Sequence, residues 1–325
     1  MTLGMVSTIV PVFNRPAQLQ EAVASVLAQD WQPIEVIIVD DGSTDGGATL
    51  AAAQALAAGH PGIVRVATQA NGGPGVAREH GRQLARGEFI QYLDSDDVLL
   101  PGKFSAQVAA LQARPDADVA YGITHFRDHT GQLHPGPHKD TGIEKATMFP
   151  SFLNSRWWET ATPLYRASVC EKAGPWTSLR LEEDWEYDCR IASLGGRLVW
   201  CPVPVSEHRD HEGDRLSRGA ALDARRQRQR ATAESLIYLH ARAYGLTPAD
   251  PEMQIFARSL FLLCRQCGAA GLPDDARQLF GLAQDAAGEA GARSGQMRAY
   301  AALAALLGWK YMGKLSVWAD RIRRG

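Results

Sequence analysis

"EFIQYLDSDDVLLPGK", residues 88–103, joins a mostly apolar run to a cluster of carboxylates. The run from Phe89 to Leu93 is typical of a buried strand, and Asp94, Asp96 and Asp97 follow it directly. Repulsion among these like charges costs stability unless a cation or a hydrogen-bond network compensates it. Asp and Ser are also ordinary turn residues, so this stretch alone fits either a polar turn or a binding site.

Three earlier apolar runs, at residues 5–13, 34–40 and 63–67, also end in polar clusters. The clusters are "PVFNR" (11–15), "DDGSTD" (40–45) and "NGGPG" (71–75). Helical patterns separate the runs, and this alternation predicts an α/β fold whose mostly parallel central sheet is flanked by helices. Since ligands bind where the carboxyl ends of parallel strands meet at one edge, we expect the four clusters to form one site.

The composition is that of a globular protein of 325 residues, 45% apolar and 22% charged, with a net charge of −2. This charge gives no reason to expect a nucleic-acid partner. Five cysteines without a framework spacing favour reduced thiols in a cytoplasmic compartment. The sequence shows neither a signal-peptide pattern nor an apolar run of about 20 residues. We therefore expect a cytoplasmic protein, or one attached peripherally to the inner face of the membrane.

The sequence changes character near residue 218, where Ala, Arg, Gln and Leu at helical spacing replace the strand patterns. We therefore divide the chain into an α/β domain at 1–218 and a helical C-terminal region at 219–325. The helical region could serve packing, oligomerisation or contact with a membrane surface. An apolar stripe beside basic residues near the end is typical of an interfacial helix: Leu303, Leu306, Leu307, Tyr311 and Leu315 with Lys310, Lys314, Arg321, Arg323 and Arg324.

The D-x-D pair Asp94 and Asp96 suits a hard divalent cation, because Mg²⁺ and Mn²⁺ prefer carboxylate oxygens and share their coordination with diphosphates. Such a metal neutralises a diphosphate and improves it as a leaving group. The sequence lacks the motifs of two other kinds of nucleotide site, the Rossmann dinucleotide site and the P-loop. No G-x-G-x-x-G follows the first apolar run, and no Walker A sequence G-x-x-x-x-G-K-[ST] occurs in the chain.

"PVFNR", "VDDGSTDGG", "NGGPGVAR" and "YLDSDD", in this order, resemble the nucleotide-binding half of inverting family 2 glycosyltransferases of the A-type fold. Two later stretches extend the resemblance: "GPWTSLRLEEDWEYDCRIASLGG" (174–196), with its Glu-Asp pair, and the basic segment "EHRDHEGDRLS" (207–217). The resemblance covers roughly residues 5–218. Single motifs of this kind are weak, the D-x-D above all, but their joint order is specific.

The resemblance assigns roles to individual residues. It implies a nucleotide site made from Pro11, Val12, Phe13, Arg15, Asp40, Asp41, Asn71, Arg78, Asp94 and Ser95. It implies a Mn²⁺ or Mg²⁺ site made from Asp94, Asp96 and His211, with His208 as the rival of His211 and with Arg209 or Arg215 beside phosphate. Asp184 would be the general base that activates the acceptor hydroxyl. Taken alone, the acidic run 182–188 would be a solvated helix start.

The resemblance implies a metal-dependent, inverting glycosyltransferase that moves a sugar from a nucleotide-diphosphate donor to an acceptor hydroxyl. The family suggests that the donor is a UDP-sugar and that the acceptor belongs to surface polysaccharide or glycoconjugate synthesis. A glycosidase needs a second carboxyl group to protonate its leaving group, whereas a diphosphate on a metal leaves without that proton, so one base suffices.

Two alternatives to this activity stay open. The first is a non-catalytic sugar-nucleotide-binding or scaffold protein. The second is a sugar-phosphate nucleotidyltransferase, although "PVFNRP" is not the glycine- and Arg/Lys-rich loop of that class. The identity of the acceptor, a glycan or a lipid-linked molecule, and homo-oligomer formation are also left open.

Overall fold

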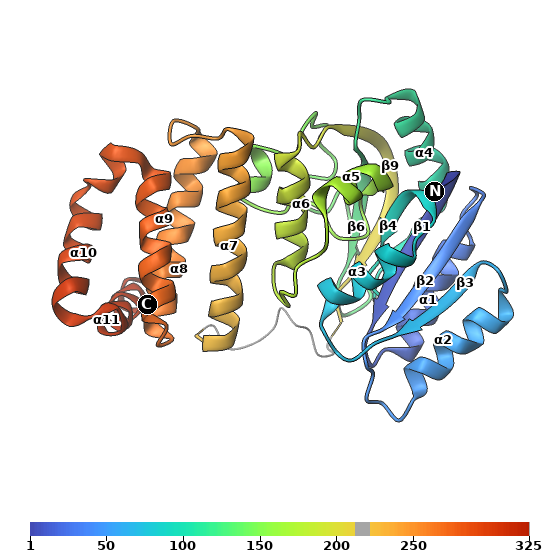
Figure 1. The fold of residues 1–325 in the computed structure, drawn as a ribbon, viewed down its shortest axis with the longest axis horizontal. Coiled ribbons are helices and arrows are strands. Elements are labelled where there is room, and N and C mark those ends of the chain that lie inside the picture. The colour runs from blue at the N-terminus through green and yellow to red at the C-terminus, as the bar shows by residue number, and fades with distance from the viewer. Residues whose placement is uncertain (212–221, 325) are drawn as a thin grey trace. The chain divides into compact units, whose positions relative to one another are not determined.

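A computed structural model describes residues 1–211 and 222–324 (Figure 1). The contacts between residues divide them into two compact units. The α/β unit consists of Met1–Met148, Arg156–Ser178 and residues 194–211. The helical unit consists of Phe149–Ser155, Leu179–Ser193 and residues 222–324. The expected domain boundary at residue 218 falls outside the described residues.

The α/β unit contains one mixed sheet with the strand order β3-β2-β1-β4-β8-β6-β9-β5, in which β7 pairs with β6. Parallel pairing joins β3, β2, β1 and β4, and also the long strands β6 and β9, whereas the antiparallel pairings are short. The mostly parallel sheet predicted from the sequence is thereby confirmed. The strands are β1 Thr2–Val12, β2 Ile34–Asp40, β3 Val64–Thr68, β4 Gly87–Tyr92, β5 Val98–Leu99, β6 Val119–Arg127, β7 Leu133–His134, β8 Leu164–Arg166 and β9 Leu198–Arg209.

Helices flank the sheet, as Figure 1 shows: α1 Pro16–Leu27, α2 Ala48–Gly59, α3 Pro74–Leu84, α4 Lys103–Ala113 and α5 Ala167–Ala173. All seven residues of β2 and the last seven of β1 are buried, as expected of apolar strands covered on both faces. The predicted apolar face of α1 is also buried, with Leu19, Val23 and Val26 in the core. Helix α3 lies close against β1 at Gly81. A Cβ at this position would lie only 2.3 Å from Cγ2 of Ile9, so the close packing requires a glycine.

The helical unit is built from the 3₁₀ turn η1 Ser151–Leu153 and from α6 Glu183–Ser193, α7 Ala224–Tyr244, α8 Pro251–Ala269, α9 Pro273–Ala292, α10 Gly295–Leu307 and α11 Trp309–Arg324. The sequence pattern near the C-terminus suggests one helix with an apolar stripe. The structure has two helices there, because Gly308, with φ 85°, ends α10. No helix of the described residues is both long and apolar enough to span a bilayer.

Candidate nucleotide-sugar site

The carboxyl ends of β1, β2 and β4 lie side by side at one edge of the sheet. Val12 is paired with Asp40 of β2, and Ile9 is paired with Tyr92 of β4. Asp40 is in turn paired with Thr68 of β3. The four polar clusters follow these paired residues along the chain, so the register of the sheet brings them to the same edge.

The turn after β1 presents an exposed aromatic ring. Pro11 and Val12 are buried at the end of the strand, whereas Phe13 is 41% exposed. Asn14 donates from Nδ2 to Oγ1 of Thr44 at 3.1 Å, and the backbone N of Thr44 donates to Oδ1 of Asn14 at 2.7 Å. These two bonds tie the turn after β1 to the turn after β2. The ring of Phe13 therefore stands on a fixed backbone.

Asp41 fastens the loop after β2 to the glycine-rich loop after β3. Its Oδ1 accepts from the backbone N of Gly72, and its Oδ2 from that of Gly73, each at 2.8 Å. Asn71 donates from Nδ2 to the Asp41 carbonyl at 2.9 Å. Gly42, with φ 70°, allows the close approach, since a Cβ there would lie 2.8 Å from the backbone N of Asn71. Asp41 and Asn71 thus determine the shape of this part of the site.

Arg78, which is buried, and Asp94, which is partly exposed, form an ion pair. Arg78 of α3 is 3% exposed, and its Nη2 lies 2.7 Å from Oδ1 of Asp94. The guanidinium also lies over the ring of Trp176, 4.9 Å from its centroid. Burial alone would raise the pKa of Asp94, but Arg78, with smaller contributions from Arg156 and Arg15, holds this pKa below its ordinary value. Arg78 therefore keeps Asp94 ionised and oriented.

Asp96 receives two basic side chains from different parts of the chain. Nη1 of Arg15 and Nε2 of His211 lie 2.7 and 2.8 Å from the same oxygen, Oδ2. His211 is thus the histidine that contacts the D-x-D, whereas its rival His208 contacts Asp97. Ser95, between the two carboxylates of the D-x-D, is buried.

A carboxylate beside an imidazole is a donor set that Mn²⁺ accepts. Among residues 1–211 and 222–324, however, no group of three or more His, Cys, Asp and Glu side chains is arranged to hold an ion. A cation at Asp96 and His211 would take its other ligands from a diphosphate and water, as nucleotide-bound Mg²⁺ does. The residues present fit such a shared site and not a closed protein cage.

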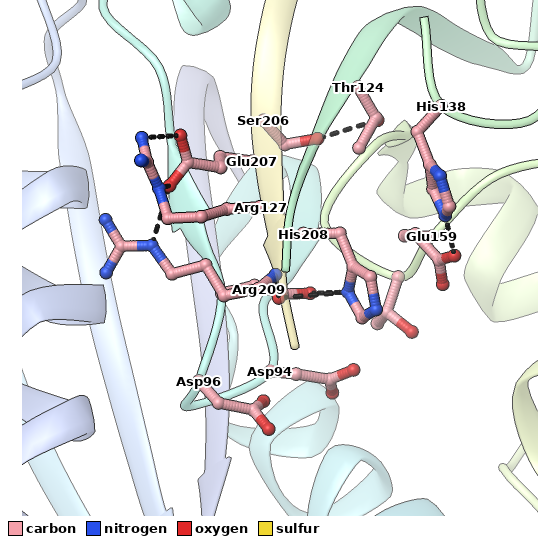
Figure 2. Close-up of polar contacts among 12 residues, drawn as sticks. Asp94, Asp96, Thr124, Arg127, His138, Glu159, Ser206, Glu207, His208 and Arg209 are labelled. Atoms are coloured by element: carbon pink, nitrogen blue, oxygen red, sulfur yellow. Dashed lines mark hydrogen bonds and ion pairs between the residues drawn. The ribbon is translucent and has the colours of Figure 1, made fainter. Parts of the chain in front are cut away.

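Asp97 is a third carboxylate of the site, and the sequence motifs assign no role to it. It is 2% exposed and accepts from the backbone N of Arg209 at 2.9 Å, while Nδ1 of His208 lies 3.1 Å from both its oxygens. Figure 2 shows His208 and Arg209 at the end of β9, above Asp94 and Asp96. Burial raises the pKa of Asp97 to about 6, and His208 opposes this shift. Asp97 thus fastens the end of β9 to the D-x-D loop.

A hollow of about 360 Å³ lies beside Asp96 and Asp97. Arg127 and Arg209 line it, and both contact the carboxylate of Glu207, at 2.7 and 2.8 Å (Figure 2). Arg209 is also paired with Glu21, so the two guanidinium groups of this wall are matched by two carboxylates. A guanidinium group binds a phosphate as readily as a carboxylate, so Arg209 could exchange one of these partners for a phosphate. Arg215, the other residue expected beside phosphate, lies outside the described residues.

Asp184 belongs to the helical unit and lies in the first turn of α6. It is half-buried, and its Oδ1 accepts from the backbone N of Trp185 at 2.7 Å. Trp185 donates from Nε1 to the carbonyl of Phe152 at 2.7 Å and packs edge-on against Phe256, with ring centroids 6.5 Å apart. The indole therefore anchors the first turn of α6 within the helical unit.

Comparisons with known proteins show the family and the fold of this chain. The model of the family described as glycosyl transferase family 2 matches residues 7–170. An uncharacterized glycosyltransferase of Rickettsia felis is 34% identical over 128 residues, which cover 39% of this chain and 21% of that protein. The crystal structure of Staphylococcus aureus TarS 1–349 in complex with UDP-GlcNAc has a TM-score of 0.66 at 20% identity, covering 97% of this chain and 92% of that chain.

A second solved structure is the mannosyltransferase PcManGT from Pyrobaculum calidifontis in complex with GDP-Man and Mn²⁺. Its TM-score is 0.54 at 20% identity, and the match covers 95% of this chain and 83% of that chain. The likeness to TarS confirms the expected A-type glycosyltransferase fold. This chain spans about a fifth of the length of the first curated relatives that it matches. Because the family model matches more than half of the sequence, the chain belongs to glycosyl transferase family 2.

Proposed function

We propose that this chain is a metal-dependent, inverting glycosyltransferase that moves a sugar from a UDP-sugar to an acceptor hydroxyl. The observation that carries the proposal is the contact of Asp96 with both Arg15 and His211 at the carboxyl end of β4, in a family 2 domain. A carboxylate and an imidazole suit a divalent cation, and a guanidinium beside them suits the diphosphate.

Asp96 and His211 would hold Mn²⁺ or Mg²⁺, with Asp94 as a further ligand. When bound, the ion neutralises the diphosphate and makes it a better leaving group. Arg15 can exchange its bond to Asp96 for one to a phosphate oxygen, because a guanidinium binds either group. Arg209 adds a second guanidinium beside the hollow.

The nucleotide would lie across the ends of β1, β2 and β4. The exposed ring of Phe13 can stack on the base, and Asp40 can accept a hydrogen bond from the base or the ribose. The remaining contacts would come from Pro11, Val12, Asp41, Asn71 and Ser95. The uridine base follows from the family resemblance, and TarS, which has the same fold, has been solved with UDP and with UDP-GlcNAc.

Asp184 would act as the general base. It takes the proton of the acceptor hydroxyl while that oxygen attacks the anomeric carbon of the sugar. The diphosphate leaves from the opposite face with the bonding electron pair, so the configuration is inverted. One carboxylate suffices because the leaving diphosphate does not need a proton.

We further propose an acceptor of surface polysaccharide or glycoconjugate synthesis, reached at the inner face of the membrane by the helical region 219–325. The support is a set of large exposed apolar side chains on each of α10 and α11: Leu303, Leu306, Leu307, Tyr311, Leu315, Trp318 and Ile322. Lys310 and Lys314 add positive charge to α11. The acidic Asp320 of the same helix is paired with Arg265 at 2.9 Å. A basic apolar helix of this kind suits anionic lipid headgroups. A homo-oligomer through the same side chains is the alternative.

A thermal-shift experiment tests the donor and the metal. UDP with Mn²⁺ should raise the unfolding midpoint, and EDTA should abolish the gain, because a ligand stabilises the state that binds it. Asp96→Asn and His211→Ala should lose most of the gain, whereas the exposed Lys172→Met should keep it. If no nucleotide shifts the wild-type midpoint with Mn²⁺ present, the proposal is wrong.

Turnover separates the proposal from its alternatives. The wild type should release UDP from a UDP-sugar, and Asp184→Asn should bind the donor but turn it over at least tenfold more slowly. Binding without turnover by the wild type would favour the scaffold protein. Release of pyrophosphate from UTP and a sugar phosphate would favour the nucleotidyltransferase.

A further inference from the structure

Helix α7 holds the segment that carries Asp184. Nε of Arg230 donates to Oε1 of Glu182 at 2.8 Å. Farther along the same helix, Nε2 of His240 lies 2.9 Å from Oε1 of Glu186. Asp184 stands between these two held positions, so α7 contacts the chain on both sides of it.

The backbone at Glu182 needs such support. Its φ is 60°, a left-handed conformation that costs a residue with a Cβ free energy. The carbonyl of Glu182 accepts from the backbone N of Glu186 at 2.9 Å, which begins α6. The orientation of the first turn of α6, and hence of Asp184, therefore depends on this strained residue.

Arg230 is the common anchor of two acidic side chains. Its Nε binds Glu182, and its Nη2 donates to Oε1 of Glu234 at 2.9 Å. Its Nη1 donates to Oε1 of Gln266 on α8 at 3.3 Å. Oε2 of Glu182 and Oε2 of Glu234 are buried and have no hydrogen-bond partner among the described residues. Among the described residues, Arg230 is thus the side chain that donates hydrogen bonds to both carboxyl groups.

The charges of the group balance when Glu234 is protonated. Glu234 is 3% exposed, and burial raises its pKa to about 8, with a further contribution from Glu182 and against the effect of Arg230. Burial also raises the pKa of Glu182, but Arg230 and Arg226 oppose this shift, so we take Glu182 as the ionised partner of Arg230 at neutral pH. The protonated carboxyl group of Glu234 accepts the hydrogen bond from Nη2 of the same guanidinium.

We propose that Arg230 and Glu234 are positioning residues for the general base: they fix the backbone at Glu182 so that the first turn of α6 presents Asp184 in one orientation. This inference rests on the proposed role of Asp184. It makes the C-terminal helices part of the catalytic apparatus, because Arg230 is supplied by α7 and Gln266 by α8. Arg230 itself acts only through Glu182.

Hydrogen exchange tests the holding contact without any need for activity. In Arg230→Met, backbone amides of residues 182–190 should exchange at least tenfold faster than in the wild type, because the first turn of α6 loses its anchor. Arg228→Met is the matched control: it removes an arginine from the same helix, 65% exposed and 3.6 Å from Asp275. It should exchange like the wild type in this segment. Equal protection in both variants would overturn the inference.

Kinetics test the consequence for the reaction. Arg230→Met should lower kcat about tenfold to a hundredfold, since small misplacements of a catalytic group have effects of this size. The KM for the UDP-sugar and the thermal shift with UDP and Mn²⁺ should not change, because the proposed donor residues belong to the α/β unit. Arg230→Lys should recover part of kcat, whereas a merely structural role would not separate kcat from KM.

The outcomes distinguish this inference from the proposed function. If Asp184→Asn is as active as the wild type, the base is wrong and the positioning role falls with it. If Asp184→Asn is inactive while Arg230→Met matches Arg228→Met in exchange and in kcat, only the positioning role is wrong. Should Arg230→Met fail to fold, Glu182→Met removes the acceptor of Nε of Arg230, and Glu234, no longer repelled by Glu182, can ionise beside Arg230. Faster exchange over residues 182–190 in that variant supports the inference, and unchanged exchange overturns it.

Discussion

The side chain of Lys103 carries an amino group into the core of the α/β unit. Lys103→Met should increase the free energy of unfolding near neutral pH. Lys103 is fully buried at the start of α4, and its Nζ donates to the carbonyl of Thr162 at 2.8 Å. Burial lowers the pKa of Lys103 well below its ordinary value, and Cys201 opposes this shift without reversing it. Gln107 also donates to the Thr162 carbonyl, at 3.0 Å, so this acceptor keeps a partner in the variant.

The sign of the pH dependence follows from proton counting. An unfolded lysine has a pKa of about 10.4 and binds a proton that the folded state lacks above its own lowered pKa. The free energy of unfolding of the wild type should therefore rise with pH, by up to about 1.4 kcal/mol per pH unit, until the unfolded lysine also loses its proton. Lys103→Met removes this slope and keeps the length of the side chain. Its advantage over the wild type should shrink toward pH 10.

Urea unfolding followed by tryptophan fluorescence at pH 7, 8, 9 and 10 measures this effect. Taking the difference between variant and wild type cancels the titration of the other groups. Lys172→Met, which removes an exposed lysine from α5 of the same unit, is the control and should follow the wild-type curve. Parallel curves for Lys103→Met and the wild type would refute the reasoning.

Three further predictions concern the site and the helical unit. Arg15→Met should tighten the binding of Mn²⁺ alone and weaken that of Mn²⁺ with UDP, as measured by electron paramagnetic resonance titration, because Arg15 lies 2.7 Å from Asp96. Glu234, with a folded-state pKa of about 8 against about 4.3 unfolded, should make the wild type lose stability as pH rises from about 5 to 8. Glu234→Gln should lose this dependence in urea unfolding. Trp318→Glu should reduce cosedimentation with phosphatidylglycerol vesicles severalfold, whereas Leu133→Glu, an exposed site of the α/β unit, should not.

The strands that build the site could be predicted from the sequence. β2, most of β4 and the last seven residues of β1 are buried, and they therefore show as mostly apolar runs. Parallel pairing then places their carboxyl ends at one edge, which is why the order of runs and clusters along the chain is enough to group the clusters into one site. The roles assigned within those clusters stay predictions.

The contacts that hold the site together could not be predicted in the same way. Arg230 and Glu182 are 48 residues apart in sequence, and His240 and Glu186 are 54 apart. A local pattern does not indicate pairs at such separations. The two histidines of "EHRDH" were indistinguishable for a similar reason. In the structure they contact different carboxylates, because β9 ends at Arg209. His208 lies within the strand and contacts Asp97, whereas His211 lies beyond the strand and contacts Asp96.

The cluster "DSDD" at the end of a buried strand is compatible with a stable fold because each carboxylate has its own basic partner: Asp94 with Arg78, Asp96 with Arg15 and Asp97 with His208. These partners come from α3, from the turn after β1 and from β9. An ordinary polar turn does not need them, since its Asp side chains are satisfied by water or by their own backbone. The convergence of three basic groups from distant segments on one short loop is therefore the structural reason to regard the loop as a site. It also means that the geometry of the D-x-D depends on α3 and β9 as much as on β4.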